Sequence, residues 1–518
     1  MKTAAQHNFA MVPRAEIPRS QFNLSHSHKT TFSAGKLIPV YLSEALPGDT
    51  FNLHMTSFAR LTTPIVPVMD NIYLDTFFFA VPIRLIWENW QKFNGEQTNP
   101  GDSTDFLVPQ IIADASTGWL TGSNADYMGI PVGIPSLAHS ALFHRSLNLI
   151  WNEWFRDQNL QDSLPVLTDD GPDPVTTPGY DLPLYRNARH DYFTSCLPWP
   201  QKGEAVSIPL GTSADVKVNH FAGATTASEN AFYVVNGNAT NSYGATAETR
   251  AGNFAAGDEA NLYADLTNAT AATINSLRQA FQIQKLYERD ARGGTRYIEI
   301  IRSHFGVVSP DARMQRPEYL GGSSMPLNMN TVPQTSSTDA TSPQGNLAAY
   351  ATASGNHAGF TKSFTEHCIL VGLISARADR HYQNGLNRMF SRRSRWDFYW
   401  PALAQIGEQA VLQKEIHAQG TAGDDDVFGY IPRYDEYRFK PNQITGLYRS
   451  QPTAPNTTLD FWHLAMDYSG GVALNETFIR ENPPMNRILA VAGQPDFLLD
   501  TYFQIKTARP MPTYGVPA

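Results

Sequence analysis

The residues with the clearest chemical character lie between positions 377 and 400, where arginines alternate with aromatic side chains. The six arginines of this window stand beside only two acids, Asp379 and Asp397; they are Arg377, Arg380, Arg388, Arg392, Arg393 and Arg395. The aromatic residues among them are Tyr382, Phe390, Trp396, Phe398, Tyr399 and Trp400. Guanidinium groups bind phosphates and aromatic rings stack on bases, so this composition suits a surface that binds single-stranded nucleic acid.

The same composition is also typical of protein interfaces, because arginines and aromatic residues are enriched where subunits meet. We favour this second interpretation and expect an inward-facing or intersubunit position. The candidate residues for either contact are Arg388, Arg392, Arg393, Arg395 and Trp396.

A second basic segment lies at the N-terminus. Lys2, Arg14, Arg19 and Lys29 stand there beside the single acid Glu16 before residue 40. Prolines within residues 1–46 disfavour a helix, so the segment is predicted to be an extended arm. We expect it either to contact phosphates or to pack along a neighbouring chain. Four widely spaced charges would release few counterions on binding a nucleic acid, so the sequence does not favour either contact.

Catalytic and metal-binding motifs are missing from the sequence. It has no P-loop, G-x-S-x-G, H-E-x-x-H, C-x-x-C or dinucleotide fingerprint. His26 and His28 lie two residues apart, but without a third ligand nearby they are more simply read as solvent-exposed histidines. The sequence leaves open a carboxylate pair brought together by folding. We therefore expect no catalytic residue, metal or cofactor, and a protein that is not an enzyme.

Composition points to buried surface and to partners. Charged residues make up 17% of the chain and aromatic residues 11%, which indicates extensive cores or interfaces. The net charge of -9 means that any nucleic-acid contact needs a local patch or a separate basic partner. Cys196 and Cys368 are predicted to be buried free thiols. With neither a signal peptide nor a membrane span in the sequence, we expect synthesis in a cytosol and no membrane insertion.

The element that should organise the fold is the stretch at 47–95. Residues 51–56 alternate apolar and polar, which predicts a half-buried strand. Residues 71–82 are apolar on both faces, with Ile72, Leu74, Phe78 and Ala80 on one and Tyr73, Phe77, Phe79 and Val81 on the other. A strand of this kind is covered twice. We expect the second cover to be helical insertions or a neighbouring subunit, with Phe77 and Phe79 at a subunit interface.

The remaining elements fit one β domain at 47–518. Further strands are predicted at 364–374 and 497–506. Short or amphipathic helices are predicted at 87–93, from a cap near Ser136 to residue 159, and within a helical insertion at 270–305. Residues 211–268 shift to Ala, Thr, Asn, Gly and Ser with scattered aromatics, and are predicted to form a variable surface insertion.

Long and unusual strings in the sequence resemble the major capsid proteins of the Microviridae, specifically the gokushovirus type. The strings are NFA at 8–10, RSQF at 19–22, PGDTF at 47–51, DTFFFAVP at 75–82, IWNEWFRDQNL at 150–160, RNARHDYFTS at 186–195, PEYLGG at 317–322, WDFYWP at 396–401 and GEQ at 407–409. They span nearly the whole chain, and residues 211–268 are the part without a matching string.

The resemblance implies a mainly β fold, an eight-stranded antiparallel jelly roll with long loop and helical insertions. It implies a T=1 icosahedral shell of this chain around circular single-stranded DNA, in the virion, after synthesis in the host cytoplasm. It also implies a small basic DNA-binding protein as partner, and a host surface receptor that meets the 211–268 insertion at a threefold protrusion. The rival interpretations are a β-sandwich carbohydrate-active enzyme and a glycan-binding protein.

Overall fold

The computed structural model describes residues 17–206, 273–336, 343–451, 458–468, 471–491 and 493–514, and four short strands between 215 and 265. The chain divides into two compact units, one of Met1–Pro200 with Ala291–Ala518 and one of Gln201–Asp290.

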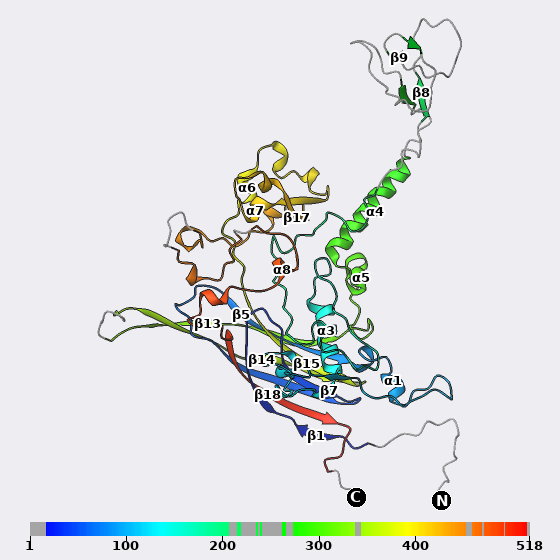
Figure 1. The fold of residues 1–518 in the computed structure, drawn as a ribbon, viewed down its shortest axis with the longest axis vertical. Coiled ribbons are helices and arrows are strands. Elements are labelled where there is room, and N and C mark those ends of the chain that lie inside the picture. Colours follow the sequence, from blue (N-terminus) through cyan, green and yellow to red (C-terminus); the bar gives the residue numbers. More distant parts are fainter. Residues whose placement is uncertain are drawn as a thin grey trace, which may run out of the picture. The chain divides into compact units, whose positions relative to one another are not determined.

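Two antiparallel sheets build the first unit (Figure 1). The larger has the order β1 (Ser20–Asn23), β18 (Phe497–Arg509), β4 (Thr50–Leu61), β14 (Leu347–Ser363) and β13 (Asn328–Pro333), with β2 (His26–Phe32) also paired to β18. The smaller has the order β12 (Glu318–Pro326), β5 (Ile72–Pro82), β15 (Cys368–Ala378) and β3 (Ile38–Ala45). The chain passes between these sheets repeatedly, so β2, β18, β4 and β14 lie opposite β3, β15, β5 and β12. This confirms a mainly β antiparallel sandwich, with a strand order consistent with the expected jelly roll.

The alternation of apolar and polar residues explains how the sheets pack. Every second residue of β4 and of β18 is buried, and the residues between them are exposed or half-buried. Phe51 and Leu53 of β4 join Phe503 of β18 in one core with residues of the smaller sheet. The half-buried strand predicted at 51–56 is thereby confirmed, and it extends to Leu61.

Strand β5 is buried on both faces, as its sequence predicts. Ile72, Leu74, Phe78 and Ala80 belong to the core between the sheets. Phe79 and Val81 belong to a second core, which continues into the helix α3 (Leu142–Ile150) and the π-helical turn η2 (Trp151–Phe155). The second cover is therefore the insertion that follows β5.

The position of Phe79 corrects the expected subunit interface. Its side chain is 1% exposed in the single chain. Its ring centroid lies 5.6 Å from that of Trp154 and 6.0 Å from that of Phe155. Phe77 is half-buried, with its ring 5.2 Å from that of Phe155. Both side chains are packed by their own subunit, because the helical insertion covers this face of β5.

The insertion after β5 differs from the prediction in its helix boundaries. The expected cap Ser136 has a positive φ of 55° and lies outside the helix, which begins after Ala141. The predicted helix at 87–93 shortens to α1 (Trp90–Phe93). A separate 3-10 turn, η1 (Ile83–Leu85), precedes it. The same insertion contains β6 (Gln110–Ile112), α2 (Asn124–Tyr127) and β7 (Ala138–Ser140), and α5 (Tyr297–Phe305) precedes β12.

A second long insertion, between β15 and β18, forms a lobe around a further core, to which the insertion after β5 contributes Phe193 and Cys196. That core includes Phe193, Val411, Ile416, Phe428 and Ile479, together with the buried free thiol of Cys196. Its elements are α6 (Arg388–Ser391), η3 (Arg395–Asp397), η4 (Pro401–Leu403), β16 (Glu408–Leu412), α7 (Gln413–Ile416), η5 (Ala422–Asp425), β17 (Val427–Pro432), η6 (Asp435–Tyr437), η7 (Gly446–Tyr448), η8 (Asp460–Trp462), α8 (Glu476–Ile479) and η9 (Met485–Arg487).

The N-terminal segment departs from the extended arm predicted for residues 1–46. From Ser20 onward it supplies β1, β2 and β3, which pair within both sheets. The alternating burial of β2 reflects its pairing with β18, and His28 is half-buried there. Lys2 and Arg14 lie outside the described residues.

The second unit is described in part. It contains most of α4 (Ile274–Gly293) and two antiparallel strand pairs, β8 (Asp215–Val218) with β11 (Leu262–Asp265) and β9 (Val235–Asn236) with β10 (Ala239–Thr240). A helix predicted within the insertion at 270–305 is found as α4. Most of the predicted insertion at 211–268 lies outside the described residues.

Candidate assembly surface

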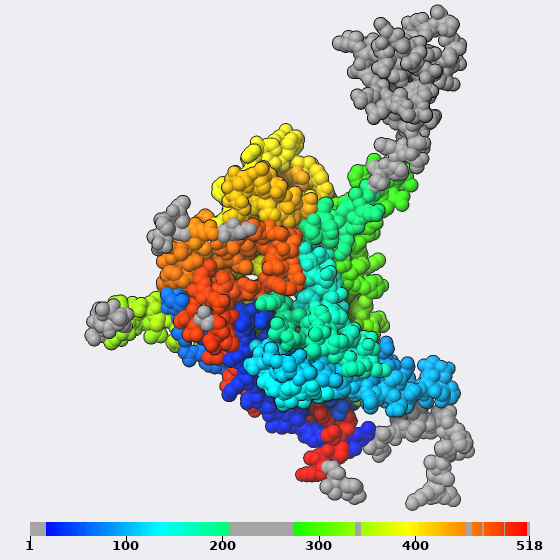
Figure 2. All heavy atoms as spheres, in the orientation of Figure 1, coloured from blue at the N-terminus to red at the C-terminus, as the bar shows by residue number. Residues whose placement is uncertain are grey.

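The predicted arginine and aromatic residues form one exposed surface on the lobe between β15 and β18. We call residues 386–406 with 433–439 the arginine–aromatic surface; in Figure 2 this lobe is yellow to orange. Seven of its aromatic side chains are between 39% and 69% exposed: Phe390, Trp396, Phe398, Tyr399, Trp400, Tyr437 and Phe439. Isolated exposed aromatics are common, but a contiguous group of this size marks an interaction site.

Local hydrogen bonds fix the backbone of this surface. The Asn387 side chain caps α6 by accepting from the backbone N–H of Met389. The Asp397 carboxylate accepts from the backbone N–H groups of Ser394 at 2.7 Å and Arg393 at 2.9 Å. These hydrogen bonds lower the pKa of Asp397 and keep the carboxylate ionised. The arginines are therefore presented on a closed turn.

The predicted arginines fall into two kinds. Arg388 forms an ion pair with Glu415 at 3.1 Å, and Arg392 forms one with Glu436 at 3.4 Å. Burial raises the pKa of Glu415, although the charge of Arg388 opposes that rise. Arg393 and Arg395 are exposed. The first pair of arginines holds the lobe together, and the second pair is available to a partner.

Arg395 and Trp396 belong to one stacked group. The Arg395 guanidinium lies over the rings of Trp396 and Trp400, at 5.2 and 4.7 Å from their centroids. Arg392 lies in the same way over Tyr437, at 4.5 Å. Stacked guanidinium groups are positioned before a partner arrives, which lowers the entropic cost of binding.

Charge balance on the lobe favours a protein partner over nucleic acid. Residues 386–448 contain eight cations and eight acids. The cations are Arg388, Arg392, Arg393, Arg395, Lys414, Arg433, Arg438 and Lys440, and the acids are Asp397, Glu408, Glu415, Asp424, Asp425, Asp426, Asp435 and Glu436. A nucleic-acid surface needs a net excess of cations. An aromatic surface on a lobe without net charge is typical of a contact between proteins.

The other predicted cations lie elsewhere. Arg377 is buried and bonded to Asp75 of β5 at 2.9 Å. Arg380 donates to the backbone carbonyl oxygens of Phe478 and Arg480. Arg19 is exposed, and it donates to the carbonyl of Gly48 at 2.7 Å and to the Thr50 hydroxyl at 3.1 Å. The sequence showed one basic window, whereas the fold divides it between the interior and the surface.

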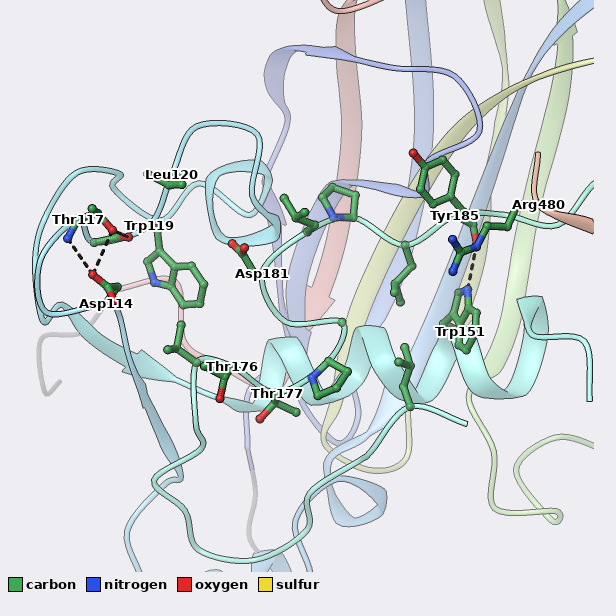
Figure 3. Close-up of a pocket in the computed structure, with 18 of the residues that line it drawn as sticks. Asp114, Thr117, Trp119, Leu120, Trp151, Thr176, Thr177, Asp181, Tyr185 and Arg480 are labelled. Atoms are coloured by element: carbon green, nitrogen blue, oxygen red, sulfur yellow. Dashed lines mark hydrogen bonds between the residues drawn. The ribbon is translucent and has the colours of Figure 1, made fainter. Parts of the chain in front are cut away.

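A groove of about 700 Å³ lies beside α3 and is a candidate for a small-molecule site (Figure 3). Its lining includes Trp119, Trp151, Leu182, Asp181 and Arg480. The carboxylate at its edge, Asp114, accepts four hydrogen bonds from Ser116 and Thr117. These bonds lower the pKa of Asp114. A glycosidase acid needs a raised pKa, so Asp114 does not have the character of such a group.

Metal-binding clusters and membrane-spanning helices are both absent from the described part of the chain. Within it, no three His, Cys, Asp or Glu side chains gather as a metal site. None of the helices there is long and apolar enough to cross a bilayer.

The β-sandwich with two long insertions and an exposed aromatic surface is the architecture of a structural protein that associates with other chains. Residues 10–518 match the family described as "Capsid protein (F protein)", and the chain belongs to this family of phage capsid proteins. It is therefore a protein of the virion and not an enzyme, which rejects the carbohydrate-active rival. The resemblance read from the sequence strings is confirmed.

Three relatives are similar over their whole length. Capsid protein VP1 of Bdellovibrio phage phiMH2K is 49% identical, over 99% of this chain and 98% of the relative. Capsid protein VP1 of Chlamydia phage 1 is 41% identical, over 100% and 98%. Capsid protein VP1 of Spiroplasma virus 4 is 36% identical, over 99% and 98%.

Proposed function

We propose that this capsid protein is the major shell protein, that its copies form a T=1 icosahedral shell around circular single-stranded DNA, and that the arginine–aromatic surface joins neighbouring copies. The observation that carries the proposal is the group of seven exposed aromatic side chains on a lobe without net charge. Such a surface gains free energy when a partner covers it, because aromatic side chains dominate the energy of interfaces. Closed shells form when one surface meets a different surface on the next copy.

The test removes the exposed contacts and leaves the internal ion pairs intact. The variant Arg393→Ala, Arg395→Ala, Trp396→Ala should fold normally and fail to form shells. Arg392 is kept, because its loss would leave the nearly buried Glu436 without its ion-pair partner. Lys92→Ala, an exposed cation of another insertion, is the matched control and should assemble normally. Normal DNA-filled particles from the triple variant would reject the proposed interface.

Two further parts of the proposal concern partners. A net charge of -9 supports a small basic protein that neutralises the enclosed DNA. The polar composition of residues 211–268, rich in Ala, Thr, Asn, Gly and Ser, supports contact with a host surface receptor. Deleting most of 211–268 should leave shell formation intact and abolish attachment to host cells. Loss of subunit folding in that deletion would argue against a peripheral insertion.

A further inference from the structure

The larger sheet has one face that the core does not use. On β4 and β18 the residues that point away from the core are mostly polar. They are Asn52, His54, Thr56, Phe58 and Arg60 on β4 and Leu498, Asp500, Tyr502, Gln504 and Lys506 on β18, all exposed. Ser27, Lys29 and Thr31 of β2 continue the same face, because they pair with Tyr502, Asp500 and Leu498. We call these thirteen residues the outer sheet face.

Charge on the outer sheet face differs from that of the whole chain. It carries three cations, Lys29, Arg60 and Lys506, and the single acid Asp500. Asp500 is paired with Lys29 at 2.5 Å, and both side chains are largely exposed. In a chain of net charge -9, this excess of cations is local. A local cationic patch is what the sequence required for contact with nucleic acid.

Two aromatic rings stand among these cations. Phe58 is 51% exposed and Tyr502 is 50% exposed. Phe58 lies opposite Asp500 and Tyr502 lies opposite Thr56, so the two rings are diagonal neighbours on adjacent strands. Diagonal neighbours are about 7–8 Å apart, which large side chains can bridge. Open sheet faces that carry such rings bind single-stranded nucleic acid by stacking its bases.

We propose that the outer sheet face binds single-stranded DNA, with phosphates at Lys29, Arg60 and Lys506 and bases stacked on Phe58 and Tyr502. This inference rests on the proposed function, since it names the surface that meets the enclosed DNA. A second copy of the chain is a poorer occupant, because like charges would oppose each other if two such faces met. The arginine–aromatic surface, with its seven exposed aromatic side chains, then serves assembly, and the two roles fall on different surfaces.

The test uses the unassembled full-length chain and a fluorescent oligothymidine, with affinity measured against salt concentration. Arg60→Ala with Lys506→Ala should weaken binding and reduce the slope of log K against log salt by about 1.4, since each phosphate contact on a single strand contributes about 0.7. Phe58→Ser with Tyr502→Ser should weaken binding by at least about 30-fold and leave the slope unchanged. Asp500→Asn should strengthen binding, because it removes the one acid.

Arg393→Ala with Arg395→Ala is the control and should bind the oligonucleotide as the unaltered chain does. The inference is overturned if the outer-face variants bind normally, if the control loses binding instead, or if the unaltered chain does not bind. It is also overturned if outer-face variants lose only shell formation, which would make the face a contact between copies. Failure of the shell proposal is separate, because oligonucleotide binding is measured before assembly. Circular dichroism of each variant checks that it has folded.

Discussion

Asp75 lies on β5 with a buried carboxylate between two arginines from distant segments. Arg377 donates to it at 2.9 Å, and Arg186 is bonded to the same oxygen. Burial alone would raise the pKa of Asp75, but a hydrogen bond from Ser324 and the charges of both arginines lower it overall. Asp75→Asn should cost about 3 kcal/mol of unfolding free energy, because the buried Arg377 loses the nearer of its two ion-pair partners and keeps only Asp379 at 3.4 Å.

The control for this prediction is the exposed ion pair of Asp500 with Lys29. Asp500→Asn should change stability by about 0–1 kcal/mol, since a surface pair is screened by solvent. Urea unfolding of the two variants beside the unaltered chain gives the comparison. Equal losses in both variants would show that burial of the Asp75 network does not matter for stability.

His144 on α3 gives the fold a dependence on acid. Its ring is buried against Trp119, His139 and Tyr180, with Asp173 and Arg145 close by. Burial, and then the charge of His139, lower its pKa to about 3. The unfolded chain binds a proton below about pH 6.5 and the folded chain does not. Stability from His144 is therefore present at neutral pH and is lost as the pH falls from about 6.5 towards 3.

The measurement is the unfolding free energy of the unassembled chain at pH 7 and at pH 5. The His144 contribution should fall by about 2 kcal/mol between these values. His144→Phe keeps a packed ring and removes the titrating group. Between pH 7 and pH 5 the unfolding free energy of this variant should therefore fall by about 2 kcal/mol less than that of the unaltered chain. If both proteins lose the same free energy, His144 is not the titrating group.

For individual residues, the sequence identified the residue types but not the side chains that they contact. Its basic window contained both buried and exposed arginines, because Asp75, Glu415 and Glu436 come from other segments of the chain. The outer sheet face was missed for the same reason. Its three cations and two aromatic rings come from three separate segments of the sequence, and only the register of β2, β4 and β18 brings them together.

Among the elements, β5 separates what pattern alone can predict from what it cannot. Its two apolar faces were read correctly, since the period of two is a local property. The sequence did not decide whether an insertion or another subunit covers the second apolar face of β5, because an apolar pattern does not show which chain packs against it. The boundaries of α3 and the strands after Ser20 were missed, since tertiary pairing decided them.

The prediction at this scale compares two phenylalanines on neighbouring sheets. Phe79→Asp places a charge in the core under α3, so the chain should fail to fold. Phe58→Asp on the exposed face of β4 should stay folded, with a stability change near 0.5 kcal/mol. Soluble expression and circular dichroism distinguish the two. A folded, soluble Phe79→Asp monomer would contradict this and would indicate that Phe79 lies at a subunit interface.

For the whole molecule, two surfaces of different character account for two tasks. The arginine–aromatic surface is rich in exposed aromatic side chains and belongs to a lobe that has no net charge over residues 386–448, which suits contact between copies. The outer sheet face is polar with an excess of cations, which suits an enclosed nucleic acid. Each surface has variants that should affect one task and spare the other.

We propose above all that copies of this chain form closed shells by themselves. Electron microscopy and light scattering of the purified full-length protein test it most directly. We expect uniform closed particles from the unaltered chain and separate folded subunits from the Arg393→Ala, Arg395→Ala, Trp396→Ala variant. A folded chain that stays monomeric at every concentration, or shells that form equally well from the variant, would contradict it.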